Sequence, residues 1–377
     1  MTTGAIDLGE GSVALAPPGL AARFGEFLAV GGATLALLPL AWLAPKLVGT
    51  DDAELAAGFF TFHVAFVLND PHFSVTYLLF YDDVRRRAFG DAFGRAQRIR
   101  YLVAGFVVPA LLVGWAAVAV ARHSARLLGF EIQLMFLLVG WHYVKQGFGV
   151  LSTLAARRGR KIRPRERLAL LFHCYAAWGF AWANPATPAG DFEEKGVVFR
   201  SVAHPRWLEL VTGSVLAASV LVLAWALVVE RRRAEARMPL GPFVVFLISV
   251  WVWSVFSAVN PIVRYFVPAL HSLQYLYFVG LLRRAELRES AGAFSPPLTS
   301  RLVLFALSAL GLGFVLFHGV PGILDATLFG RRRAPDDLGP TPFFAAFFVV
   351  VNLHHYVMDA VIWRRENPKM QLLARKR

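Results

Sequence analysis

Runs of about 20 apolar residues recur along this chain, and no other feature limits its fold as strongly. A helix of that length crosses the hydrocarbon core of a bilayer and satisfies its own backbone hydrogen bonds there. Hydrophobic residues make up 57% of the chain and charged residues only 17%, below the charged share of about 25% usual in soluble proteins. The sequence therefore predicts an all-α, polytopic membrane helical bundle of about ten transmembrane helices. The expected spans are residues 27–49, 55–81, 101–121, 128–154, 167–184, 207–229, 242–259, 261–282, 302–319 and 342–363.

The basic residues are concentrated in alternate connections between these spans. With both termini in the cytoplasm, the inner segments hold 28 of the 39 lysines and arginines, and the outer segments hold ten. The formal charge of +14 therefore indicates orientation by the positive-inside rule, and nucleic acid is not expected as a partner. We expect a multi-pass protein of a bacterial inner (cytoplasmic) membrane. Its expected parts are an N-terminal cytoplasmic tail (1–25), a single transmembrane domain (26–364) and a basic cytoplasmic tail (365–377).

The chain has one cysteine, Cys174, which falls within the fifth expected span. A disulfide framework is excluded, and so is a zinc or iron–sulfur site held by cysteines of this chain. The connections are too short to form a soluble domain of useful size. Any chemistry is therefore expected among the helices or at their mouths.

Five histidines occur at nearly the same depth in four of the expected spans. They are His72 in the second span, His142 in the fourth, His271 in the eighth, and the adjacent His354 and His355 in the tenth. An ionisable side chain inside the bilayer is costly and usually faces the interior of a bundle, and imidazole is a common ligand of transition metals. We therefore expect a membrane-embedded metal centre, with His72, His142, His271 and His355 as ligands and His354 as a fifth candidate.

Polar residues share helical faces with two of these histidines. Lys145 and Gln146 follow His142 by three and four residues, and Gln274 follows His271 by three. These three side chains are expected to donate hydrogen bonds to a bound oxygen species or to the headgroup of a substrate.

Two aspartates accompany the other ligands. Asp70 and His72 flank Pro71, and a proline bends a helix and frees a backbone carbonyl. Asp359 follows His355 by four residues, so the two side chains lie on one face of a continuous helix. A carboxylate oriented on an imidazole is a usual partner of a metal ligand. We expect Asp70 and Asp359 either to bind the metal or to fix the tautomers of the imidazoles.

Histidines outside this layer have a simpler interpretation. Taken singly, His63 and His173 are expected to make hydrogen bonds between helices. His318 falls at the outer end of its span and is expected to be solvated.

The histidine layer has three alternative uses. Transmembrane haems are typically held by histidine pairs, and a two-haem path would stack such pairs at different depths, so a single layer disfavours that path. One haem fits a single layer but would leave histidines over. A compact site of one or two ions uses the set better, with iron favoured and copper or zinc as alternatives. A proton- or ion-coupled transporter that uses the intramembrane histidines and aspartates is the alternative from a different class.

The enzyme interpretation is favoured by the excess of histidine over carboxylate, by the aromatic-rich spans and by the absence of a detectable repeat. We expect a metal-dependent membrane oxidoreductase of the oxygenase, desaturase or hydroxylase type, acting on a lipid or isoprenoid substrate. Its expected partners are membrane lipids, this lipophilic small-molecule substrate and an electron donor protein.

The isolated histidines are similar to those of membrane carotenoid-cleaving oxygenases, which draw single histidines from separate spans. They resemble the histidine-box desaturases and hydroxylases only loosely, because the chain contains neither HxxxH nor HxxHH. No longer run of sequence carries either resemblance, so neither assigns a family.

Overall fold

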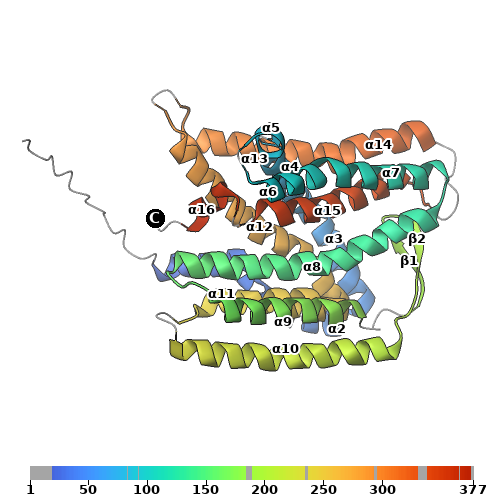
Figure 1. Cartoon of the computed structure of the whole chain (residues 1–377). Helices are drawn as coiled ribbons and strands as arrows, with labels where there is room; N and C mark the ends of the chain where they lie inside the picture. The colour runs from blue at the N-terminus through green and yellow to red at the C-terminus, as the bar shows by residue number, and fades with distance from the viewer. Residues whose placement is uncertain are drawn as a thin grey trace, which may run out of the picture.

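The computed structural model describes residues 19–374, except 83, 92, 184–188, 234–236, 293–294, 330–337 and 365. Within this part the chain is all-α apart from one antiparallel hairpin. The long helices run side by side in one bundle, and most connections lie at its two ends (Figure 1). Of the two expected tails, residues 1–18, 365 and 375–377 lie outside the described part.

Several long helices are interrupted by short π-helical turns or a 3₁₀ turn, labelled η. The first half of the chain forms α1 (Leu20–Phe27), η1 (Leu28–Gly32), α2 (Thr34–Val48), α3 (Thr50–Ala65), α4 (Asn69–Tyr81), α5 (Val84–Phe89), α6 (Arg95–Leu102), η2 (Val103–Val107), α7 (Val108–Ala121), α8 (Ala125–Arg157) and α9 (Pro164–Ala183). The second half forms β1 (Gly190–Glu194), β2 (Val197–Ser201), α10 (Arg206–Arg233), α11 (Leu240–Leu247), η3 (Ile248–Val255), η4 (Phe256–Ala258), α12 (Pro261–Glu289), α13 (Leu298–Phe314), η5 (Val315–Gly319), α14 (Val320–Leu324), η6 (Asp325–Phe329), α15 (Pro342–Ile362) and α16 (Pro368–Ala374).

Six of the described helical segments are long and apolar enough to cross a membrane, and a bent pair over residues 20–48 would make a seventh. These helices make the chain a candidate multi-pass membrane protein, but they do not confirm the expected number of about ten. The fifth and eighth expected spans correspond to α9 and α12, which are more polar and are not among the six.

The second expected span is not one helix. In the structure α3 ends at Ala65 and α4 begins at Asn69, so the expectation of a continuous helix over 55–81 was wrong. Pro71 does not bend a helix interior; it lies in the first turn of α4, where its missing N–H would have had no helical partner. The interruption gives Asp70 and His72 a position at the start of a helix inside the bundle.

Helices α12 and α15 lie at the centre of the bundle and fix the depth of the site. Helix α12 contacts α3, α4 and η1, and helix α15 contacts α4, α7 and α8. The start of α15 is capped by Asp325, whose two carboxylate oxygens accept the backbone N–H groups of Phe343 and Phe344 at 2.9 and 3.0 Å. This cap satisfies donors that a helix terminus otherwise leaves unpaired.

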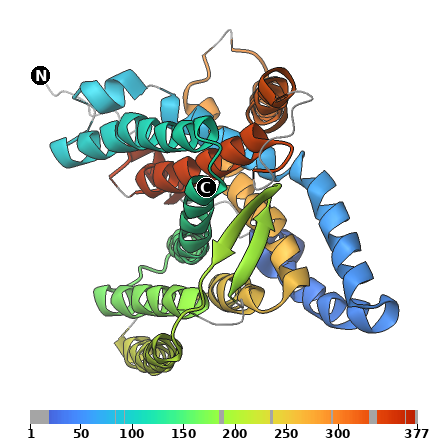
Figure 2. The ribbon, with the colours of Figure 1, turned by 90° about the vertical axis from the view of Figure 1, so that its right-hand side faces the viewer.

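The β1–β2 hairpin lies across one end of the bundle (Figure 2). Its turn residues Lys195 and Gly196 have φ of 53° and 85°, the left-handed values that a two-residue type I′ turn requires. Phe199 of β2 packs on Gly129 of α8, where an added Cβ would lie only 2.6 Å from the Phe199 Cβ. The glycine therefore allows the hairpin to lie against α8.

Candidate metal centre

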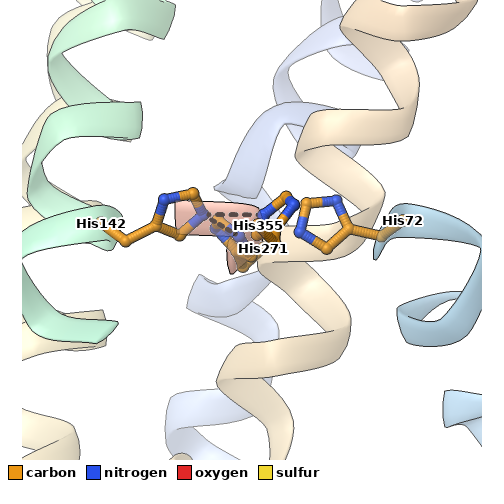
Figure 3. A group of neighbouring side chains, drawn as sticks. All are labelled: His72, His142, His271 and His355. Carbon is orange, nitrogen blue, oxygen red and sulfur yellow. Dashed lines mark hydrogen bonds between the residues drawn. The ribbon is translucent and has the colours of Figure 1, made fainter. Parts of the chain in front are cut away.

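Four buried histidines from four helices converge at the centre of the bundle. His72 comes from α4, His142 from α8, His271 from α12 and His355 from α15, and each is at most 4% exposed. One ring nitrogen of each lies within 4.8 Å of the corresponding nitrogen of every other. Figure 3 shows the four rings directed at a common point. The structure thus brings together four of the five histidines that the sequence analysis placed in one layer.

The separations of the ring nitrogens suit a single ion. The Nε2 atoms of His142 and His271 lie 3.0 Å apart, and those of His142 and His355 lie 3.3 Å apart. Two nitrogens bound to one ion at about 2.0–2.1 Å are separated by roughly 3.0–3.4 Å in tetrahedral or octahedral geometry. The His72 ring completes the group, with its centroid 4.4 Å from that of His355 and 4.9 Å from that of His271. The four histidines could therefore hold one metal ion.

Local sequence signals fix the two longest helices of this group. Ser124 precedes α8, and its side chain accepts the backbone N–H of Leu127. Asn260 precedes α12 and accepts the N–H of Val263, with Pro261 at the first helical position. Such caps are preferred at helix starts because they pair otherwise free N–H groups. They help to determine where each helix begins, and so the depth of His142 and His271.

The fifth candidate, His354, lies outside the group. Its Nε2 is 2.9 Å from the carbonyl oxygen of Ala104 and its Nδ1 is 3.0 Å from the hydroxyl of Tyr77. The carbonyl only accepts, so Nε2 carries the proton and Nδ1 accepts from Tyr77. Both nitrogens are engaged, and His354 ties α15 to α4 and η2 instead of facing the other imidazoles.

Asp359 borders the four histidines. Its Oδ1 accepts the Tyr275 hydroxyl at 2.7 Å and the Trp363 indole N–H at 3.0 Å. Its Oδ2 lies 3.8 Å from the Nε2 of His142 and 3.9 Å from the Nε2 of His355. Neither Tyr275 nor Trp363 was predicted from the sequence as a partner of Asp359. For Trp363, its spacing of four residues from Asp359 was the available signal.

The two glutamines form a bridge beside the centre. The Gln146 side chain donates to the Gln274 amide oxygen at 2.8 Å and to the backbone carbonyl of His271 at 3.2 Å. Gln274 in turn donates to the carbonyl of Val30 in η1. These amides tie α8, α12 and η1 together near His142 and His271, and the amide group of each donates to a protein acceptor.

Asp70 pairs with a histidine outside the layer. The Nε2 of His318, in η5, lies 2.9 Å from the Asp70 Oδ2, and its ring stacks on Phe66 with centroids 4.4 Å apart. The expectation that His318 is simply solvated was therefore wrong, because η5 folds against the start of α4. Gly313 makes this approach possible, since a Cβ there would come within 2.9 Å of the Asp70 backbone.

Lys145 and two other histidines are placed away from the centre. The Lys145 ammonium lies 5.9 Å from the ring centres of both Phe148 and Tyr175, so it faces α9. His173 accepts the indole N–H of Trp251 at 3.1 Å, and its other nitrogen lies 2.9 Å from the Ser219 hydroxyl. The structure thus shows the inter-helix hydrogen bond expected of His173. His63 instead bonds to the carbonyl of Phe59 in its own helix.

A cavity of about 580 Å³ adjoins the centre. His72 and His271 form part of its wall, and Asp70 and His318 line it as well. Most of the remaining wall is apolar and includes the side chains of Phe62, Phe66, Trp178, Trp253, Phe344 and Phe348. Two of the aromatic side chains of this wall are accessible, with Phe62 53% and Phe66 39% exposed.

No family model, curated protein or solved structure matches this chain.

Proposed function

We propose that this chain is a membrane-embedded, histidine-ligated metalloenzyme that oxidises a lipid or isoprenoid substrate. The observation that carries the proposal is the convergence of four buried imidazoles from four separate helices beside an apolar cavity. Buried polar groups are normally paired, yet neither nitrogen of His72 has a hydrogen-bond partner among the described residues, and the Nε2 atoms of His142, His271 and His355 lie against one another. A bound cation would give the converging nitrogens a partner.

Iron is the metal that we assign to the centre. Imidazole suits iron, copper and zinc, but zinc has no redox chemistry. Oxidation of an apolar chain needs a redox metal with an open position, which is the usual arrangement in non-haem iron oxygenases. The proposed reaction belongs to the oxygenase, desaturase or hydroxylase type, with electrons supplied where needed by a donor protein.

The cavity supports a lipophilic substrate that enters from the bilayer. Its wall is dominated by aromatic and apolar side chains, and two of these, Phe62 and Phe66, are exposed. Pockets of this volume and character commonly bind small apolar ligands with a few polar groups that fix orientation. We propose that the substrate is positioned in this cavity with its reacting carbons beside His72 and His271.

We further propose a bacterial inner-membrane topology with about ten crossings and cytoplasmic termini. The C-terminal ends of α8, α10 and α12 lie at one end of the bundle together with α16, whereas the hairpin lies at the opposite end (Figure 1). The described residues of the basic segments 156–167, 230–241 and 283–301 belong to the first end, which supports its assignment to the cytoplasm.

Metal analysis of the full chain purified in mild detergent tests this function. The wild-type protein is expected to contain about one iron ion per chain, and His142→Ala to lose most of it, because a ligand nitrogen is removed. His173→Ala is the matched control: it removes a buried histidine whose nitrogens both contact protein groups, and it should keep the metal.

A proton- or ion-coupled transporter remains the second candidate, favoured by one observation. The Asp70–His318 pair lines the cavity. Asp70 follows the break between α3 and α4, and His318 lies in the π-helical turn η5 between α13 and α14. Interrupted helices with paired charges are typical of transport sites. A folded, metal-free wild-type protein that moves protons or ions across proteoliposomes, and loses this activity in Asp70→Asn, would replace the enzyme proposal with this one.

A further inference from the structure

Among the described residues, protein donors use only one oxygen of Asp359. Tyr275 and Trp363 both donate to Oδ1, at 2.7 and 3.0 Å. The Tyr275 oxygen lies 2.7 Å from the Thr76 hydroxyl, so the hydrogen-bonded group extends from α15 through α12 to α4. With Oδ1 fixed in this way, Oδ2 faces the Nε2 atoms of His142 and His355 at 3.8 and 3.9 Å.

The four histidines bring no negative charge to a bound cation. Metal-bound imidazoles usually donate their second N–H to a carboxylate, a carbonyl or water. Here the Nδ1 atoms of His271 and His355 are buried without such a partner among the described residues. The other nearby aspartate, Asp70, is paired with His318. A buried divalent ion held by neutral imidazoles alone would be strongly disfavoured by its desolvation, so a carboxylate close to the ion has a large effect.

The distances place Asp359 just outside the shell of ligand atoms. Neighbouring ligands of one ion lie roughly 3.0–3.4 Å apart, whereas Oδ2 stands 3.8 and 3.9 Å from the two nitrogens. A carboxylate at this separation is positioned to accept a hydrogen bond from a water or another protic ligand on the ion.

We propose that Asp359 is the anionic partner of the metal centre. Its Oδ2 accepts a hydrogen bond from the protic ligand at the open position of a divalent transition metal, and its charge offsets part of the charge of the ion. Tyr275 and Trp363 are positioning residues, because their hydrogen bonds to Oδ1 fix the orientation of the carboxylate. This inference rests on the proposed function, since it requires a metal at the four histidines.

Titration of the metal-stripped full chain with Co²⁺ tests the inference, because Co²⁺ reports both affinity and ligand geometry through its visible absorption. Asp359→Asn keeps the size of the side chain and removes its charge, and it is expected to weaken Co²⁺ binding about 10- to 100-fold and to shift the spectrum. Asp359→Glu restores the charge and should return the affinity to within about threefold of wild type, with a shifted spectrum because the carboxylate is displaced. Tyr275→Phe keeps the carboxylate but removes one of the two hydrogen bonds that orient it, so it should weaken Co²⁺ binding less than Asp359→Asn does and shift the spectrum.

Two results would overturn the inference, and they are distinguishable. If folded Asp359→Asn protein binds Co²⁺ with wild-type affinity and spectrum, Asp359 is not the anionic partner, although the metal centre stands. If folded wild-type protein binds no Co²⁺, both the inference and the proposed function fail. Should the asparagine variant not fold, the glutamate variant decides: a wild-type spectrum there would contradict a carboxylate beside the ion.

Discussion

Two sets of buried histidines in this bundle differ in what their nitrogens contact. His173 and His354 are buried, and both nitrogens of each meet a protein group. In the other set, which comprises His72, His142, His271 and His355, ring nitrogens converge on one another, and within the described part of the chain the His72 nitrogens have no hydrogen-bond partner. Burial of a histidine in a membrane protein therefore does not by itself indicate a ligand. Convergence of unpaired nitrogens does, because a buried polar atom without a partner is unfavourable unless something binds it.

The largest effect on metal content is expected at the adjacent residues His354 and His355 in α15, which belong to different sets. His355→Ala is expected to lower metal occupancy about tenfold or more, because it removes one of four ligands. His354→Ala removes a neighbouring imidazole bonded to Tyr77 and Ala104, and should keep the metal while lowering stability. Metal content per folded chain measures both. Equal metal loss in the two variants would contradict the division into two sets.

A smaller effect is expected where α13 meets the start of α4. Gly313→Ala would place a Cβ 2.9 Å from the backbone of Asp70. Asp70 precedes His72 by two residues. Overpacking of this kind costs about 1–3 kcal/mol, and the displacement of His72 should appear as roughly threefold to tenfold weaker Co²⁺ binding. Gly311→Ala in the same helix is the control, because nothing lies within 4 Å of its added Cβ. Wild-type binding by the Gly313 variant would show that His72 tolerates a shift of α4.

The smallest effect concerns the hydrogen bond that holds His354. Tyr77→Phe removes a hydroxyl 3.0 Å from Nδ1 of that histidine, and the free energy of unfolding in detergent should fall by about 1 kcal/mol. Metal affinity should not change, because His354 lies outside the converging set. Tyr265→Phe serves as the control, since that ring is 41% exposed. A change in Co²⁺ affinity in the Tyr77 variant alone would link His354 to the centre.

Helical periodicity made part of the site predictable. Histidines at matched depth in separate apolar spans must lie in one layer of the bundle, and a helix places residues four apart on one face. His355 and Asp359 satisfy this spacing and do lie beside the same centre. The same periodicity did not predict the directions of Lys145 and Gln146, which follow His142 by three and four residues. Lys145 faces α9 and Gln146 faces α12. The directions of neighbouring side chains on a helix differ by about 100°, and the packing decides which direction is inward.

The second expected span shows a different limit. Its apolar length predicts a crossing, but α3 and α4 are separate helices, and His318 from η5 fills a position next to the interruption. A contact between residues 248 positions apart leaves no local pattern in either segment. Gly313 is equally uninformative in sequence, since its function depends on the backbone of Asp70 lying against it.

The sequence alone determined that this chain is helical and apolar enough to lie in a membrane, that His72, His142, His271 and His355 share one depth, and that a disulfide framework and a cysteine-ligated metal site are excluded. Those properties depend on composition and on periodicities within single helices. Only the tertiary structure decided that His355 and not His354 faces the other imidazoles, that Asp70 pairs with His318, and that Tyr275 and Trp363 hold one oxygen of Asp359. These choices depend on how helices far apart in the chain rotate and approach one another, and the free energy of packing that sets them involves contacts between helices, which no single segment contains.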